Sequence, residues 1–213
     1  MGIPGFERGQ RIPVSRLWAV ASAGVVLVVA VAVAAGMLLG RGAPAVEADE
    51  ADTYSAAPAC SAVPVERVRE LIPDAVLETS RSGPQADADT STCVWTSVGS
   101  DDGPPQSLHI DFTAHFTDKA GEVSGSRAAG KRLEELAPIG GLEGADHVPE
   151  LGEGALAWPG ASDGSSAEVV FRRQNMLIEV FYGGRAEDQS SGLDYGTARD
   201  GAISIAEQVA ESL

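Results

Sequence analysis

The chain has 213 residues, a length that accommodates one folded domain together with a membrane segment. Its formal charge of −16 is unevenly divided, because residues 1–40 carry three arginines against one glutamate, whereas residues 41–213 carry twelve basic and thirty acidic residues. The resulting charge of −18 on the second part repels phosphate groups, which argues against binding to nucleic acid or to anionic lipid. Aromatic residues make up only 5% of the chain, so the core of the domain is expected to be modest.

An uncharged apolar run over residues 17–39 predicts a transmembrane helix. At about 1.5 Å per residue the run spans a hydrocarbon core of roughly 30 Å, and it is longer than the apolar region of a usual signal peptide. Two alternatives stay open: cleavage near residues 43–45, where the central proline disfavours a protease, and a buried core helix, which would need a larger domain around it. Because Arg8, Arg11 and Arg16 precede the run and acidic residues follow it, the N-terminus is expected in the cytoplasm.

The predicted organisation is a cytoplasmic tail at 1–16, a single-pass membrane helix at 17–39, an acidic Ala/Pro-rich stalk at 40–59 and an extracytoplasmic domain at 60–213. The tail is too short to fold, which excludes the architecture of a receptor kinase or a membrane-bound anti-sigma factor. The stalk has too little apolar surface to order itself and is expected to be extended. Thirteen arginines against two lysines, with abundant Ala, Gly and Val, are typical of GC-rich genomes and suggest an actinobacterial cell envelope.

Cys60 and Cys93 both lie in the part predicted to be exported, where oxidising conditions favour a disulfide. Closing a loop of about 34 residues would stabilise the domain by roughly 3.5–4 kcal/mol in the chain-entropy model. Lipid attachment at Cys60 is disfavoured, because residues 57–59 lack the leucine of a lipobox and lie well beyond the apolar run. A metal site made from two cysteines alone is also disfavoured. We therefore predict a Cys60–Cys93 disulfide.

Hydrophobic periodicity predicts the elements of the domain in chain order. A short helix is expected over 64–72, followed by a strand over 93–98 and a half-buried strand over 108–116, in which apolar and polar residues alternate. A helix is then expected over 118–136, although its three glycines lower the helix propensity. The remaining elements are a strand over 154–158, a hairpin of strands 167–173 and 176–182, and a C-terminal helix over 198–213 capped by Thr197. This α-β-β-α-β-β-β-α order predicts an α+β domain with helices packed on an antiparallel sheet.

Several motifs follow one another in a recognisable order: a cysteine before a short helix, a second cysteine followed by Val94-Trp95, the run 151–158, the hairpin run 171–180, and a closing Ala-rich helix. With these motifs, residues 58–213 resemble the actinobacterial envelope proteins of domain-of-unknown-function family 3558. No catalytic residues are assigned in that family, so the resemblance implies an envelope domain and carries no site residue over. Many members look like lipoproteins, whereas this chain has a predicted membrane helix. The element order is also similar to Mog1/PsbP-like folds, which serve as binding or assembly modules.

Three further patterns match functional motifs only in part. Residues 160–164 read G-x-S-x-G, but a nucleophile elbow needs a later histidine and a strand-to-helix turn, and all three histidines precede this segment. Residues 125–131 fit a phosphate loop except that Arg132 replaces the magnesium-binding Ser or Thr, so a helical segment is expected. The aspartates lack the offsets of an EF-hand loop and are interpreted as solvated charges; they are Asp87, Asp89, Asp101 and Asp102. Trp95 and Trp158 are interpreted as core anchors.

His109, Asp111 and His115 share the outer face of the strand predicted at 108–116. Because His115 lies about 20 Å from His109 along a straight strand, only two of the three could contact one ion. We interpret them as solvated polar residues and predict no catalytic, cofactor-binding or metal-binding residue.

The sequence supports two functional hypotheses. The favoured hypothesis is a non-enzymatic, membrane-tethered domain that binds an unknown envelope protein or small ligand. The alternative is an envelope hydrolase that uses the His109/Asp111 face or an unrecognised carboxylate pair. A concave pocket joining these histidines to an acid of perturbed pKa would favour the hydrolase, and a flat acidic surface would favour the binding domain.

Overall fold

The computed structural model describes residues 47–98, 104–136, 144–160, 165–186 and 191–213. The predicted cytoplasmic tail and membrane span lie outside these ranges. Within the ranges described, no helix is both long and apolar enough to cross a membrane. All of the described residues belong to one compact unit, Ala45–Leu213.

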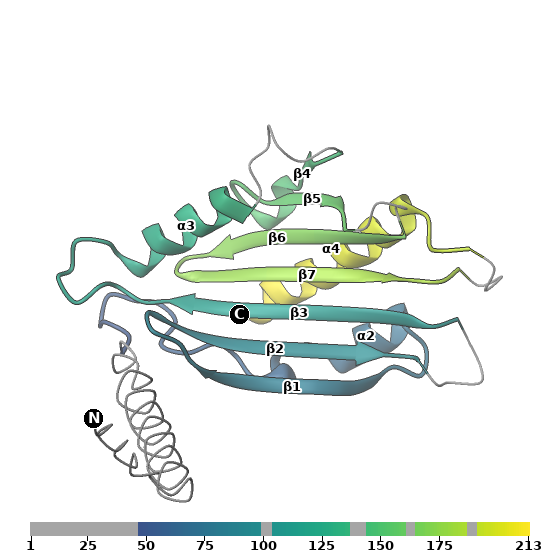
Figure 1. Ribbon diagram of the computed structural model, residues 1–213, viewed down its shortest axis with the longest axis horizontal. Helices are drawn as coiled ribbons and strands as arrows, with labels where there is room; N and C mark the ends of the chain where they lie inside the picture. Colours follow the sequence, from purple (N-terminus) through teal and green to yellow (C-terminus); the bar gives the residue numbers. More distant parts are fainter. Residues whose placement is uncertain (1–46, 99–103, 137–143, 161–164, 187–190) are drawn as a thin grey trace, which may run out of the picture. The chain divides into compact units, whose positions relative to one another are not determined.

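The seven strands of the described ranges form one antiparallel sheet in the spatial order β1-β2-β3-β7-β6-β5-β4 (Figure 1). The strands are β1 (Val76–Pro84), β2 (Ala88–Thr96), β3 (Gln106–His115), β4 (Asp146–His147), β5 (Leu156–Pro159), β6 (Ser166–Arg173) and β7 (Met176–Gly184). Strands β1 to β3 pair in sequence order, and so do strands β4 to β7. The two groups meet where β3 pairs with β7, so this central pairing decides which side chains of the two halves become neighbours.

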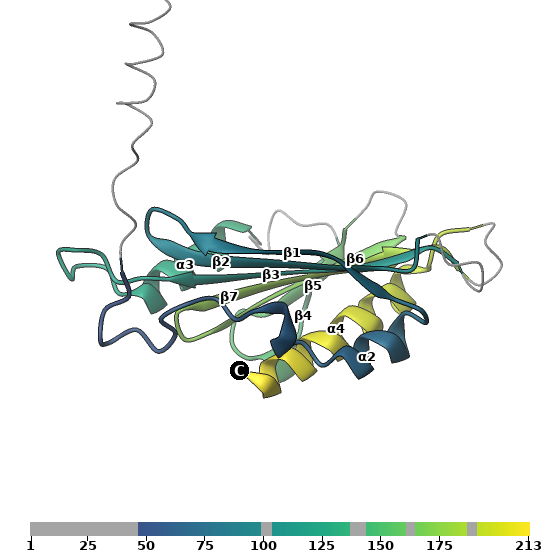
Figure 2. The same cartoon turned by 90° about the horizontal axis from the view of Figure 1, so that it is seen from below.

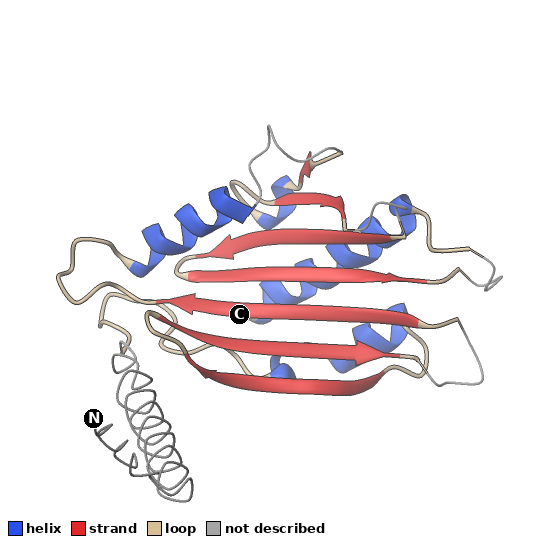
Figure 3. Cartoon of the chain, viewed as in Figure 1, coloured by secondary structure: helices blue, strands red, loops and turns tan. Residues whose placement is uncertain are grey.

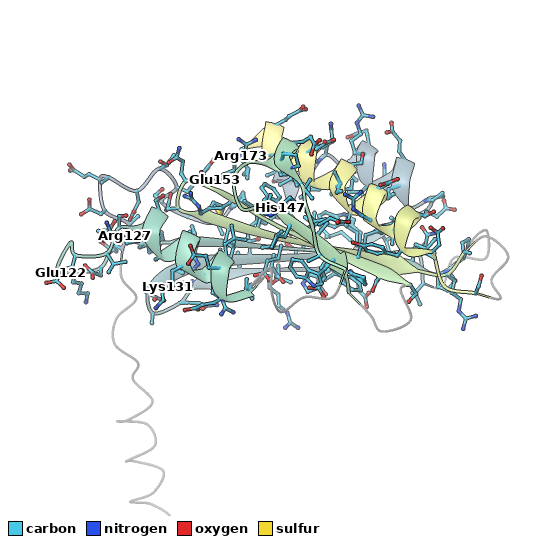
Figure 4. The ribbon with its side chains drawn as sticks, turned by 90° about the horizontal axis from the view of Figure 1, so that it is seen from above. Glu122, Arg127, Lys131, His147, Glu153 and Arg173 are labelled. Atoms are coloured by element: carbon cyan, nitrogen blue, oxygen red, sulfur yellow. A yellow bond between two sulfur atoms is a disulfide. The ribbon has the colours of Figure 1, made fainter. Side chains whose placement is uncertain are left out.

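Three α-helices of the described chain cover the sheet unequally: α2 (Val65–Leu71), α3 (Gly125–Leu136) and α4 (Tyr195–Ser212). Helices α2 and α4 lie on one side of the sheet and α3 lies on the other (Figures 2 and 4). In Figure 3, α2 and α4 pass behind the strands, and α3 lies toward the β5 and β6 edge. The described residues also include the short 3₁₀ helices η1 (Cys60–Ala62) and η3 (Pro149–Leu151).

The main core lies between the sheet and α4. Alternate residues of β3 point into it, and Leu108, Ile110 and Phe112 are completely buried. Helix α4 can approach the sheet closely because its buried face is rich in small residues. A Cβ atom at Gly201 would lie 2.7 Å from a ring carbon of Tyr182, so glycine is needed at this contact. The predicted α+β class with an antiparallel sheet is therefore confirmed, as is the alternating strand that became β3.

The first strand of the sheet was not predicted. Strand β1 is an edge strand whose residues are mostly exposed on both faces, so it lacks the alternation that marks a half-buried strand. Its partner β2 begins at Ala88, five residues before the predicted start at 93, because its polar first half is paired on both sides by β1 and β3. The predicted strand over 154–158 appears as the shorter β5, and β4 has only two residues.

Two helix starts also differ from the prediction. Helix α3 begins at Gly125 and not at 118, because the carboxylate of Asp118 accepts hydrogen bonds from the backbone N–H groups of Glu122 and Val123 and holds a turn there. The predicted cap of α4, Thr197, is wrong. The helix starts at Tyr195 and its cap is Asp194, whose carboxylate accepts a hydrogen bond from the Thr197 backbone N–H.

The predicted Cys60–Cys93 disulfide is present, with its Cα atoms 5.6 Å apart. This distance lies within the usual range of about 4.4–6.8 Å. The bridge joins η1 to the buried face of β2, and both cysteines belong to the main core. It therefore closes the chain around the segment that contains α2 and β1.

Residues 47–59 of the predicted stalk contact the domain through polar groups. The side-chain oxygen of Asn175 accepts a hydrogen bond from the Tyr54 N–H, and its amide nitrogen donates to the backbone oxygens of Tyr54 and His115. The carboxylate of Asp52 accepts hydrogen bonds from the N–H and the hydroxyl of Thr117. The segment is thus held by hydrogen bonds to the β3 and β7 ends, and Ala48, Tyr54 and Ala57 also pack against the main core.

Candidate functional site

We call the face of the sheet opposite α4 the open face. It carries a cluster of polar and aromatic residues: Thr92, His109, Asp111, Trp158, Glu168, Glu179 and Phe181. Cross-strand register builds it in two rows. In the first row, Thr92 of β2 faces Asp111 of β3, and Asp111 faces Glu179 of β7. Directly opposite residues of an antiparallel pair have Cβ atoms only about 4.5–5.5 Å apart. The register therefore places two carboxylates side by side.

The second row contains the aromatic residues of the open face. His109 of β3 faces Phe181 of β7, Phe181 faces Glu168 of β6, and Glu168 faces Trp158 of β5. Phe181 thus lies between His109 and Glu168 in the cross-strand register. Helix α3 covers the neighbouring part of this face, where its Leu133 packs with apolar side chains of β5, β6 and β7. Beside it, none of the described helices covers the two rows, which border a recess.

All of the cluster residues except Thr92 line a depression of about 210 Å³. Its lining combines an imidazole, three carboxylates and two aromatic rings from β3, β5, β6 and β7. All six are partly buried, so they are accessible to solvent without being fully hydrated. The volume lies below the roughly 300–1,000 Å³ of pockets that enclose drug-sized ligands, which fits a shallow seat for a small group.

His109 and Asp111 form the best-defined contact in the depression. Nε2 of His109 lies 3.1 Å from Oδ2 of Asp111, a close contact without the alignment of a well-directed hydrogen bond. The contact with the Asp111 carboxylate raises the pKa of His109 above its ordinary value, against the opposing effect of burial. Burial alone would raise the pKa of Asp111, but the contacts with His109 and with the Thr92 hydroxyl outweigh it and lower that pKa.

Glu179 and Glu168 behave differently from Asp111. Burial raises the pKa of Glu179, and the nearby charges of Asp111 and Glu168 add to the effect, while Arg132 and His109 oppose it. Burial also raises the pKa of Glu168, and a hydrogen bond with the Trp158 side chain opposes that change. The open face therefore holds carboxylates that lose hydration without gaining an equivalent positive partner.

The other residues singled out from the sequence do not join this cluster. His115 shares the outward face of β3 with His109 as predicted, but it lies six residues further along, and burial lowers its pKa. Asp89 accepts a hydrogen bond from the Ala57 backbone N–H, which gives it a structural role. Asp101 and Asp102 lie outside the described residues. No described group of three or more His, Cys, Asp or Glu side chains has the arrangement to hold a metal ion.

The two glycine-containing motifs have different outcomes in the structure. Residues 125–131 form the first half of α3, so they are a helix and not a phosphate-binding loop. Of the G-x-S-x-G segment, Gly160 follows β5, and residues 161–164 lie outside the described ranges. Trp95 is buried in the main core as predicted. Trp158 differs, because it packs beside the Leu133 cluster and also lines the depression.

Sequence reasoning missed Glu168, Glu179 and Phe181. A signal for them existed in the predicted hairpin, since residues that alternate with its buried apolar positions must point to the other face. Their position beside Asp111 had no such signal, because it depends on the pairing of β3 with β7. No family model matches the chain, and no curated protein or solved structure matches it either.

Proposed function

We propose that this chain is a membrane-anchored binding domain of the bacterial cell envelope, with its ligand seat on the open face. The predicted helix at 17–39 anchors it, and the arginines before that helix place the domain outside the cytoplasm. The relationship to domain-of-unknown-function family 3558 is part of the same proposal, as is the likeness to Mog1/PsbP-like binding modules. The disulfide supports an oxidising compartment.

The depression on the open face is the observation that carries the proposal. It brings together polar groups from four strands in a recess, at a place where the sheet has no covering helix among the described elements. A surface that served only solubility would have no need to desolvate carboxylates, because buried charge lowers stability. Partly buried polar groups that converge on a recess are the usual mark of a binding site.

Photo-crosslinking in the native envelope tests the proposal. A photoreactive residue at Val94, the open-face neighbour of His109, is compared with one at Ser204, which is exposed on α4 on the other side of the sheet. We expect adducts of defined mass at Val94 that are absent at Ser204. Identical adduct patterns at both positions, or no adduct at Val94, would refute the open face as the ligand seat.

Membrane orientation has its own test. Protease added to intact spheroplasts should digest residues 41–213 and spare the N-terminal tail and the span. Protection of the domain would reverse the proposed orientation. Replacing Arg8, Arg11 and Arg16 with acidic residues should produce mixed insertion, because these residues carry the positive-inside signal.

A second function, hydrolysis, is favoured by one observation. Asp111 and Glu179 face each other directly, and the pKa of Asp111 is lowered while that of Glu179 is raised. Two carboxyl groups with pKa values moved in opposite directions can act as base and acid. Turnover of envelope glycan fragments by the purified full-length protein, abolished by Glu179→Gln, would establish this function. Turnover that survives in this variant would exclude the carboxylate pair as its source.

A further inference from the structure

Within the described part of the chain, the negative charges around the depression are not balanced by an equal number of positive charges. Asp111, Glu168 and Glu179 contribute three carboxylates. The cations that act on Glu179 are His109 and Arg132, but His109 contacts Asp111, and Arg132 contacts Glu135 at 3.6 Å. A positively charged group that entered the recess would therefore meet carboxylates that have already lost part of their hydration.

The lining of the recess favours an organic cation over a metal ion. Glu168 and Glu179 are diagonal neighbours on adjacent strands, because Glu168 faces Phe181, two residues after Glu179. Diagonal positions lie roughly 7–8 Å apart, and both glutamates line the same recess. No group of three or more His, Cys, Asp or Glu side chains among the described residues has the arrangement to hold a metal ion. An ammonium or guanidinium group carries several N–H donors and can donate to more than one carboxylate.

The aromatic residues complete the chemistry. Phe181 lies between His109 and Glu168 in the cross-strand register, and Trp158 borders the recess on the β5 side. Organic cations are attracted to the faces of aromatic rings, and their carbon atoms gain from burial against the same rings. The recess of about 210 Å³ corresponds to roughly seven water molecules, a volume suited to one small cationic group.

We propose that the open-face depression binds the ammonium or guanidinium end of an organic cation, which pairs with Glu168 and Glu179 and lies against Phe181 and Trp158. This inference rests on the proposed binding function and names its ligand class. A cation with an apolar body fits the recess best, since it uses the carboxylates and the rings together. A neutral compound would leave the carboxylates unpaired, and an anion would be repelled by them.

Three probes that share one ring separate charge from size: benzylammonium, benzyl alcohol and benzoate. Each is titrated by calorimetry into the full-length protein in nanodiscs at physiological salt. We expect benzylammonium to bind at least about tenfold more tightly than benzyl alcohol, and benzoate to show no binding. Raising the salt concentration should weaken only benzylammonium, because screening acts on the charge.

Matched variants place the binding in the recess. The Glu168→Gln/Glu179→Gln variant keeps the side-chain shape and should lose the tenfold preference for the cation. The control, Glu66→Gln/Glu211→Gln, removes two exposed carboxylates from α2 and α4 on the other side of the sheet and should keep it. Phe181→Leu should weaken benzylammonium about threefold or more, through the loss of the aromatic face.

Each result decides a different point. Equal binding of benzylammonium and benzyl alcohol would overturn the cation class but leave a binding site on the open face. Equal losses in the Glu66/Glu211 control would show that overall charge, not the recess, attracts the cation, which overturns the inference as well. Failure of all three probes in the wild-type protein would also overturn it, whereas the proposed binding function fails only if photo-crosslinking at Val94 gives no specific adduct.

Discussion

Removal of the Cys60–Cys93 disulfide should destabilise the domain by an amount set largely by its loop. The bridge spans a sequence separation of 33 residues, so reduction frees a loop of about 34 residues in the unfolded chain. The chain-entropy relation gives about 12.6 cal/mol/K for this loop, which is about 3.8 kcal/mol at 25 °C. Typical domains are stable by only about 5–15 kcal/mol, so the bridge supplies a large share of the total.

Comparing reduction with alanine substitution separates the effect of the disulfide bond from the effect of core packing. Cys93 is completely buried and Cys60 is 6% exposed, so the two sulfur atoms fill space in the main core. Reduction keeps both sulfurs in place, whereas the Cys60→Ala/Cys93→Ala variant also removes them. We expect reduced wild-type protein to lose about 3–4 kcal/mol and the double alanine variant to lose somewhat more, because it leaves small voids.

Urea unfolding followed by tryptophan fluorescence measures both losses, since Trp95 is buried two residues from Cys93 on β2. With an m value of about 2 kcal/mol/M, the midpoint of the reduced protein should fall by about 2 M urea. Oxidised and reduced proteins with midpoints within about 0.5 M of each other would refute the loop argument. Two alkylatable thiols in folded protein from its own envelope would refute the bridge itself.

Three further predictions concern the open face and residues 47–59. Because the pKa of Glu179 is raised on folding, its charged form lowers the stability of the domain at neutral pH. Glu179→Gln should therefore raise the urea midpoint of unfolding at pH 7. This gain should vanish as the pH falls below the unfolded-state pKa of about 4.5, where the carboxyl group is protonated in both states. The exposed control Glu211→Gln should show no comparable gain, and a less stable Glu179→Gln protein would contradict the reasoning. Benzylammonium binding should weaken as the pH is lowered, because the raised pKa of Glu179 means that its carboxylate is neutralised at a higher pH than that of an ordinary glutamate. An affinity that does not change with pH in calorimetry would argue against this carboxylate as a partner of the cation. Asn175→Ala removes three hydrogen bonds, two of them to Tyr54, and should lower the free energy of unfolding by about 2–4 kcal/mol. It should also expose residues 47–59 to protease and to hydrogen exchange. Unchanged exchange at the Tyr54 amide would mean that the Asn175 side chain does not hold this segment.

Local patterns predicted the elements that bury one side against the core. The strand over 108–116 was readable because one face is buried and the other meets solvent, and the C-terminal helix was readable from its apolar spacing. Strand β1 was not readable for the opposite reason, since both of its faces are largely exposed. The cap at Asp194 and the turn at Asp118 depend on side-chain hydrogen bonds whose geometry periodicity does not describe.

The candidate site was likewise only partly predictable from the sequence. The outward positions of His109 and Asp111 followed from the alternation within one strand. The cysteine pairing also followed from sequence, because the chain has two cysteines and both lie in the part predicted to be exported.

The meeting of Asp111 with Glu179, and of His109 with Phe181 and Glu168, was decided only by the tertiary structure. These pairs are joined by the register between β3 and β7, which lie more than sixty residues apart in the chain and are not linked by a turn. A hairpin turn sets the register of neighbouring strands, whereas the register of distant strands is set by how their buried faces pack on a common core. The sequence alone thus determined which side chains leave the core, and the packing of β3 against β7 determined which of them share a site.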